Sequence, residues 1–258
     1  MKAKLKSFER LLNIMDELRE KCPWDKKQTI NSLRYLTIEE TYELSDAILK
    51  NDMQEIKKEL GDLMLHIVFY SRIASEKYKF DISDVINGVC DKLIHRHPHI
   101  YGDIKVKDDV EVKKNWEKLK MQEGKKSVLE GVPISLPAMI KSYRIQEKVR
   151  GIGFDWDNKK QVWAKVLEEI DELKIEVEKG DEEKIESEFG DVLFALINYA
   201  RFIKVNPEDA LEKTNKRFSN RFQIMEELIK REKLELHNMK LSEMDMFWDL
   251  AKKKYNAK

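Results

Sequence analysis

Cysteine, proline and glycine are all scarce in this chain of 258 residues, which has 2, 5 and 9 of them respectively. The two cysteines, Cys22 and Cys90, provide neither a disulfide framework nor a C-x-x-C metal motif. So few glycines and prolines, in a chain dominated by leucine, glutamate, lysine and isoleucine, disfavour a sheet-based fold. We therefore expect a protein built almost entirely of helices.

Net charge is also missing, because 49 Lys and Arg residues balance 49 Asp and Glu residues. Proteins that bind nucleic acid usually carry a basic excess, so we expect no nucleic-acid partner. No apolar run reaches the roughly 18 residues that a membrane span needs, and the first residues lack the apolar core of a signal peptide. These absences predict a cytoplasmic protein without membrane association.

What the chain does contain is an acidic pattern that occurs twice, shifted by 129 residues (168 minus 39). The two copies are Glu39-Glu40-x-x-Glu43 with Glu59-x-Gly61-Asp62, and Glu168-Glu169-x-x-Glu172 with Glu188-x-Gly190-Asp191. Each Gly-Asp pair is followed by a similar apolar run, so the repeat extends beyond the acids. Duplication of one helical module explains this self-similarity.

The predicted organisation is all-α, with two tandem helical-bundle modules at 1–123 and 138–258. The linker is placed at 124–137, where Gly131, Pro133 and Pro137 interrupt the helical pattern. Apolar periodicity predicts helices at roughly 4–20, 28–50, 53–77, 82–96, 108–122, 136–150, 159–179, 182–203, 207–232 and 241–254. The short connections between them predict antiparallel neighbours, and therefore bundles.

The repeated carboxylates fall on the apolar side of these helices. On a helical wheel, Glu40 lies in the middle of the apolar face of 28–50, and Glu169 holds the same place on 159–179. A buried carboxylate must be protonated, paired or bound to a metal. We therefore predict two metal sites, Glu40, Glu43, Glu59 and Asp62 in the first copy and Glu169, Glu172, Glu188 and Asp191 in the second. Oxygen ligands of this kind favour Mg²⁺, with Mn²⁺ as an alternative.

Two other metal sites are less consistent with the pattern. A di-iron bundle requires Glu-x-x-His on two helices, and this chain has no such pair, with Ala195 in the second copy where the first has His66. The histidines at 95, 97 and 99 are interrupted by Pro98 and have no cysteine or acidic cluster beside them, so they indicate a helix end rather than zinc. An isolated E-x-x-E is usually a solvated helix face, and only its repetition at fixed spacing is informative.

Taken together, the acidic motifs resemble those of the two-domain MazG-type nucleoside triphosphate pyrophosphohydrolases. Cys22-Pro23-Trp24-Asp25 and Arg96-His97-Pro98-His99 resemble the N-terminal half of that family, and Gly153-Phe154-Asp155-Trp156 resembles the C-terminal half. The resemblance covers nearly the whole chain. It implies the all-α NTP pyrophosphatase fold, a homodimer, dependence on Mg²⁺, and hydrolysis of (d)NTP to (d)NMP and pyrophosphate.

The resemblance also implies roles for individual residues, mainly in the C-terminal module. Its metal ligands would be Glu169, Glu172, Glu188 and Asp191. As a mechanistic hypothesis of our own, Lys184 and Glu168 complete the catalytic set, with Glu168 available to orient the attacking water. Phosphate contacts would come from Lys184, Arg217 and Arg221, and an aromatic contact from Trp248. The first copy has Glu55 where the second has Lys184, a charge reversal that argues against catalysis there.

Two other functions remain open on the sequence. The same scaffold could serve as a non-catalytic nucleotide-sensing or interaction module. The cage could also act on another phosphate chain, such as dUTP or a ppGpp-like nucleotide. Base and sugar preference stay open as well.

Overall fold

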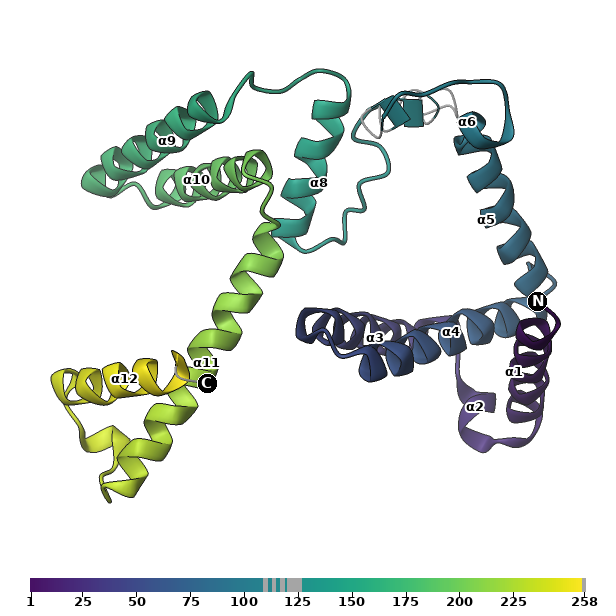
Figure 1. Ribbon diagram of the computed structural model, residues 1–258, viewed down its shortest axis with the longest axis horizontal. Helices are drawn as coiled ribbons and strands as arrows, with labels where there is room; N and C mark the ends of the chain where they lie inside the picture. The colour runs from purple at the N-terminus through teal and green to yellow at the C-terminus, as the bar shows by residue number, and fades with distance from the viewer. Residues whose placement is uncertain (109–110, 113–114, 117–118, 120–126, 257–258) are drawn as a thin grey trace. The chain divides into compact units, whose positions relative to one another are not determined.

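A computed structural model describes residues 1–108, 111–112, 115–116, 119 and 127–256, and within these the regular structure is entirely helical (Figure 1). The all-α prediction is confirmed. The chain divides into two compact units, Met1–Asp109 and Val110–Lys258. The predicted helix at 108–122 falls largely outside the described residues, so the predicted module boundary near 123 stays a prediction.

The first unit is built around a helical hairpin. Its helices are α1 (Lys2–Lys21), α2 (Pro23–Lys27), α3 (Ile30–Lys50), α4 (Met53–Ser75), α5 (Ile82–Arg96) and α6 (Pro98–Tyr101). The hairpin is α3 with α4, and α1 packs on α4. Apolar side chains of these three helices form the core, namely Met15, Leu33, Val68, Phe69 and Ile73. Burying such side chains supplies the main driving force for the hairpin to close.

The turn between α3 and α4 is fixed by two consecutive residues. Asn51 ends α3 with a positive φ of 56°, a left-handed conformation that asparagine tolerates well. Asp52 caps α4 by accepting hydrogen bonds from the backbone N–H groups of Gln54 (3.0 Å) and Glu55 (3.2 Å). This turn sets the register in which the acidic residues of α3 face those of α4.

The second unit repeats the hairpin and adds another. Its elements are α8 (Ala138–Gly151), α9 (Lys159–Lys179), α10 (Glu182–Phe202), α11 (Pro207–Arg231), the 3₁₀ turn η1 (Leu236–Asn238) and α12 (Leu241–Asn256). The first hairpin is α9 with α10, turned at Gly180 (φ 73°) and capped by Asp181. The second is α11 with α12, whose buried core residues are Ile224, Met225, Ile229 and Ala251. Two hairpins therefore make up most of this unit.

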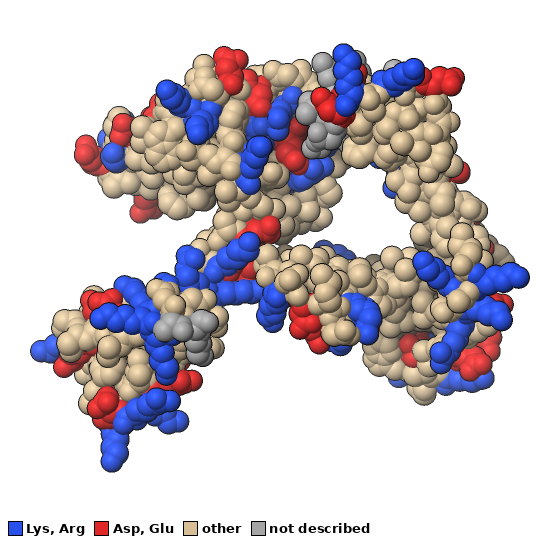
Figure 2. Space-filling view, in the orientation of Figure 1, with Lys and Arg blue, Asp and Glu red and all other residues tan. Residues whose placement is uncertain are grey.

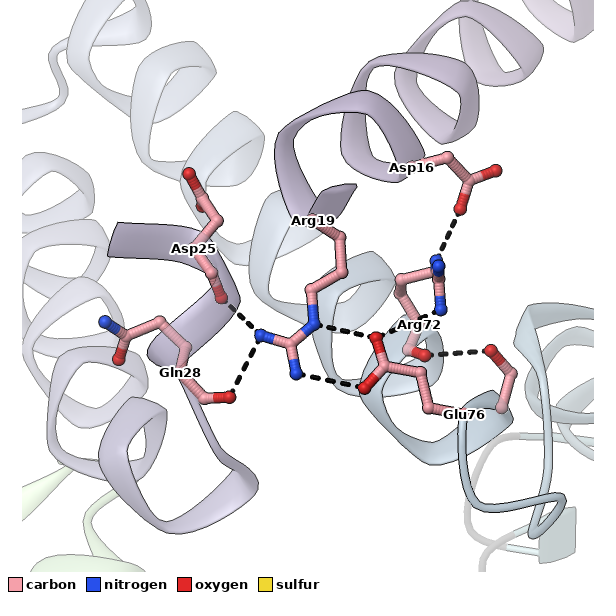
Figure 3. Close-up of polar contacts among 7 residues, drawn as sticks. Asp16, Arg19, Asp25, Gln28, Arg72 and Glu76 are labelled. Atoms are coloured by element: carbon pink, nitrogen blue, oxygen red, sulfur yellow. Dashed lines mark hydrogen bonds and ion pairs between the residues drawn. The ribbon is translucent and has the colours of Figure 1, made fainter. Parts of the chain in front are cut away.

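An arginine network joins three helices of the first unit (Figure 3). The Arg19 guanidinium donates to both carboxylate oxygens of Glu76, at 2.7 and 3.0 Å, and also to the backbone carbonyls of Asp25 and Gln28. Arg72 pairs with Asp16 at 2.6 Å and with Glu76 at 3.1 Å. The hydrogen bond from Arg19 lowers the pKa of Glu76, against the effect of burial. The network fixes α1 and α2 against the end of α4.

The second unit has its own arginine at the equivalent place, because Arg201 lies 129 residues after Arg72. The Arg201 guanidinium donates to both oxygens of Asp155 and to Asn198 Oδ1, the last at 2.8 Å. Its side chain is only 5% exposed. It thus holds the segment before α9 against α10 through a buried ion pair.

Charged side chains of both signs lie on the surface. Figure 2 shows Lys and Arg near Asp and Glu in patches, with broad areas of other residues between them. In the described part of the chain, no helix combines the length and apolar character needed to cross a membrane.

Candidate metal centres

The α9–α10 hairpin brings three predicted ligands together in the C-terminal unit. Glu169 and Glu172 on α9 and Glu188 on α10 each offer one carboxylate oxygen, and these oxygens lie within 4.8 Å of one another. Glu169 is buried, Glu188 is half-buried and Glu172 is exposed. Asp191, the fourth predicted ligand, is exposed and lies outside this group.

The α3–α4 hairpin makes the equivalent group in the N-terminal unit. Oxygens of Glu40, Glu43 and Glu59 again lie within 4.8 Å of one another, and half-buried Asp62 lies outside the group. The helical wheel placed Glu40 in the middle of the apolar face of its helix. In the structure Glu40 is only half-buried, whereas Glu59 is the more deeply buried residue, at 2% exposed. Burial here follows the contact between α3 and α4 rather than the apolar stripe of either helix alone.

Crowding of like charges perturbs both groups. Burial, together with the charges of Asp62, Glu43 and Glu59, raises the pKa of Glu40. In the other unit, desolvation and the charges of neighbouring carboxylates raise the pKa of Glu172, although Lys165 opposes the shift. Carboxylates placed this closely repel one another unless a proton or a cation lies between them.

The buried member of the N-terminal group gives a direct test of fit to a cation. Oε2 of Glu59 is buried and has no hydrogen-bond partner among the described residues. An oxygen in this state is destabilising by about 1–3 kcal/mol, and more when it is charged. Hard divalent cations take oxygen ligands of this kind, so the donor sets of both units fit Mg²⁺ or Mn²⁺.

A lysine beside the C-terminal carboxylates was missed by the sequence reasoning. Lys165 Nζ lies 2.7 Å from Glu168 and 2.8 Å from Glu169, and these hydrogen bonds raise its pKa. Glu168, which was expected to be available to orient water, is therefore engaged in an ion pair. The signal was present in the sequence, because Lys165 precedes Glu168 by three residues and Glu169 by four, spacings that share a helix face. In the N-terminal unit Lys58 plays a similar part, 3.0 Å from Glu59.

Of the predicted phosphate and base contacts, only Lys184 lies on the hairpin that carries the carboxylates. Lys184 is exposed, with its Nζ 3.4 Å from Asp181 rather than paired with Glu188. Arg217 and Arg221 lie on α11 and Trp248 on α12, so they belong to the other hairpin.

On that hairpin each of these side chains has local partners. Arg217 donates to Thr214 and Arg221 to Asn256, each at 3.1 Å, and the Arg221 guanidinium lies 5.1 Å from the Tyr255 ring centroid. The rings of Trp248 and Phe218 lie 5.1 Å apart, centroid to centroid. None of these contacts joins the basic residues to the carboxylate group.

Comparison with known families agrees with the two copies of the carboxylate group. The family model of the MazG nucleotide pyrophosphohydrolase domain matches residues 28–101 and 158–224, so it covers both acidic copies. The chain belongs to the MazG family. Its match to this model occurs twice, in agreement with the internal duplication.

Individual relatives match over almost the full length. The nucleoside triphosphate pyrophosphohydrolase of Escherichia coli K12 is 39% identical over 258 residues, covering 96% of this chain and 98% of that protein. The nucleoside triphosphate pyrophosphohydrolase/pyrophosphatase MazG of Thermotoga maritima is 43% identical, with 95% of each chain covered. A solved MazG-related protein from the same organism is 32% identical and covers 44% of this chain and 98% of its own, with a TM-score of 0.40.

Proposed function

We propose that the chain is a metal-dependent nucleoside triphosphate pyrophosphohydrolase, converting (d)NTP and water to (d)NMP and pyrophosphate, with its catalytic centre in the C-terminal unit. The observation that carries the proposal is the group of three carboxylate oxygens, from Glu169, Glu172 and Glu188, within 4.8 Å of one another. The names of the two relatives that match almost end to end support the same reaction.

Mg²⁺ is the proposed cofactor, with Mn²⁺ as a substitute. Glu169, Glu172 and Glu188 would hold it, and Asp191, one turn further along α10 than Glu188, is the proposed fourth ligand. When bound, the cation would offset the negative charge of the triphosphate and polarise the phosphorus that is attacked. The α9–α10 hairpin contributes the rigid spacing of these ligands.

The remaining residues handle the substrate. Lys184, Arg217 and Arg221 are proposed to offset charge on the phosphates, and Trp248 to contact the base. Glu168 is proposed to orient the attacking water and to accept its proton. For this step the hydrogen bond that Glu168 now accepts from Lys165 would be replaced by one from the water. The leaving pyrophosphate carries its electron pair away with the bridging oxygen.

A homodimer is also proposed. Phe189 on α10 and Phe218 on α11 keep 54% and 57% of their surface exposed, and we propose that a second chain covers this apolar surface. A second copy could bring an α11–α12 hairpin to the carboxylate group. Cytoplasmic location and the lack of a nucleic-acid partner stay predictions.

The test measures pyrophosphate release from the common NTPs and dNTPs with Mg²⁺ or Mn²⁺. Glu172→Gln removes one ligand with little change of shape, and Glu186→Gln, an exposed glutamate on α10, is the matched control. We expect loss of release in the first variant and normal release in the second. Normal release in Glu172→Gln would refute the proposed centre, and nucleotide binding without turnover in the wild type would instead support a sensing module.

A further inference from the structure

We propose that Asn198 on α10 donates a hydrogen bond to the edge of the nucleobase and so helps to select the base. The inference rests on the proposed function and deepens it, because it adds the nucleoside part of the substrate to the phosphate part. Lys184, Asp191 and Asn198 follow one another along α10 at intervals of seven residues (191 minus 184, and 198 minus 191). Residues seven apart differ by only about 20° around a helix, so these three polar side chains share one face.

The order of the three residues along this face gives the substrate a direction. Lys184 is proposed to contact the phosphates and Asp191 to bind the cation between the phosphates and the nucleoside. With the pyrophosphate end at Lys184, the nucleoside extends the other way along α10, toward Asn198. Seven residues of α-helix rise by about 10 Å, which is enough for a ribose and its base beyond the cation.

The side-chain amide of Asn198 is held in one orientation. Its Oδ1 accepts hydrogen bonds from Nε of Arg201 at 3.2 Å and from Nη2 at 2.8 Å. Because a guanidinium can only donate, these bonds assign the amide oxygen to Arg201 and turn the Nδ2 group away from it. Among the described residues Nδ2 has no hydrogen-bond partner, and Asn198 is half-buried. A donor of fixed direction is therefore open to an acceptor on a ligand.

The bond to Arg201 does not by itself explain an asparagine here. A carboxylate would pair with a guanidinium more strongly than an amide does, and only the amide adds a donor. The equivalent residue of the first unit is Phe69 (198 minus 129), which is 2% exposed and belongs to the core. The same helical hairpin thus forms with an apolar side chain at this position, so a polar one is not needed for packing.

An exposed aromatic ring lies at the same end of the hairpin. Trp163 on α9 contacts Tyr199, with their ring centroids 4.8 Å apart, and it remains 43% exposed. Tyr199 directly follows Asn198 in the chain. Stacking on an aromatic ring stabilises every base, whereas a hydrogen bond to the base edge depends on which base is present. Trp163 therefore offers a stacking surface, and Asn198 offers the contact that discriminates.

The first experiment compares substrates with and without a base. Pyrophosphate release by the full chain is measured with dTTP, dATP and 2-deoxyribose 5-triphosphate, which has no base. Asn198→Ala should lower kcat/KM for both dNTPs by about fivefold, mainly through KM, because one hydrogen bond is lost. Release from the base-free substrate should stay normal, since Arg201 keeps its bonds to Asp155. An equal loss with the base-free substrate would mean that Asn198 only positions Arg201, and it would overturn the proposal.

The second experiment changes the donor into an acceptor. Asn198→Asp keeps an acceptor for Arg201, but it presents to the base an oxygen that accepts from the amino group of adenine and repels the carbonyl oxygens of thymine. The ratio of kcat/KM for dATP to that for dTTP should rise by about tenfold. Asn31→Asp, at an exposed asparagine on α3, adds the same charge and should leave the ratio unchanged.

The outcomes separate this inference from the function on which it rests. An unchanged ratio in Asn198→Asp, with normal release by the wild type, would overturn the role of Asn198 and leave the proposed function standing. No release by the wild type from any dNTP would instead overturn the proposed function, and the inference with it.

Discussion

The two hairpins α3–α4 and α9–α10 share a carboxylate cage and differ in what surrounds it. Each brings three glutamates within 4.8 Å. In the first, Glu59 is the most buried member and Glu55 stands near the turn; in the second, Glu169 is the most buried and Lys184 holds the equivalent place. Helix packing therefore keeps the three glutamates together in both units, whereas the residue near the turn has opposite charge in the two units, which we expect to favour binding of a phosphate beside Lys184 only.

The largest difference is expected between equivalent ligands of the two cages. Glu172→Gln should lower kcat/KM for dNTP hydrolysis by about 10³-fold, since it removes a ligand of the proposed catalytic cation. Glu43→Gln, at the equivalent position, should lower it by less than about 10-fold. Steady-state pyrophosphate release measures both. Equal losses would show that the two cages act together and would break the assignment of catalysis to the C-terminal unit.

Exchange of the equivalent residues Glu55 and Lys184 is the next largest test. Lys184→Glu gives the C-terminal carboxylate group the neighbour that Glu55 provides in the N-terminal unit. The value of kcat/KM should fall by about 10²-fold, because a positive charge that stabilises the phosphates is lost. Glu55→Lys does the reverse, and it should raise binding of a non-hydrolysable dNTP, with an imido link between the α and β phosphates, above about one per chain. Lys179→Glu, at the other end of the same turn, controls for a general effect of charge. If it matches the effect of Lys184→Glu, the position of Lys184 has no special importance.

The predicted limits of the helices match the structure closely where a capping residue marks the end of a helix. α5 and α9 have the predicted limits, Ile82–Arg96 and Lys159–Lys179, because Asp81 and Asn158 cap their first turns. Three short elements, α2, α6 and η1, were missed, since a helix of one turn is too short for apolar periodicity to appear. His97 ends α5 beside Pro98, in agreement with the predicted helix end.

The acidic groups were predicted more completely than their surroundings. Spacing along one helix identified the pairs Glu40 with Glu43 and Glu169 with Glu172, because i, i+3 residues share a face. The depth of Glu59 was not predictable from one helix, since it depends on how α3 packs on α4. For the same reason the sequence did not show that the basic residues of α11 lie on a separate hairpin.

A stability difference should separate the equivalent arginines Arg201 and Arg72. Asp155→Asn leaves the buried Arg201 guanidinium with Asn198 as its described partner and should destabilise the C-terminal unit by about 2 kcal/mol. Asp16→Asn removes a partner that is 57% exposed, while Arg72 keeps Glu76, so about 0.5 kcal/mol is expected. Hydrogen exchange of amides in α10 and α4 measures the two effects separately. Similar losses in the free energy of unfolding for the two variants would mean that the burial of Arg201 does not strengthen its ion pair.

The effect of Asp155 should also depend on pH. Burial alone would raise its pKa, but the hydrogen bond and charge of Arg201, with the Trp156 amide, lower the pKa overall. Ionised Asp155 therefore stabilises the fold fully above its unfolded pKa of about 3.9, and this contribution is lost as the pH falls through the lower native value. In a series of urea denaturations, the free energies of unfolding of wild type and Asp155→Asn should differ by a constant amount near neutral pH and converge as the pH falls through the lowered native pKa of Asp155. A gap that persists in acid would assign the effect to packing instead of charge.

The smallest expected difference concerns the matched caps Asp52 and Asp181. Asparagine caps helices nearly as well as aspartate, so Asp181→Asn and Asp52→Asn change charge more than hydrogen bonding. Asp181→Asn loses the attraction to Lys184 Nζ at 3.4 Å and should destabilise α10 by about 0.5 kcal/mol. Asp52→Asn loses a favourable interaction with the helix dipole but relieves repulsion from Glu55, so its effect on α4 should be close to zero. Because both effects are electrostatic, the difference should shrink in 1 M salt, and a difference that salt leaves unchanged would point to cap geometry.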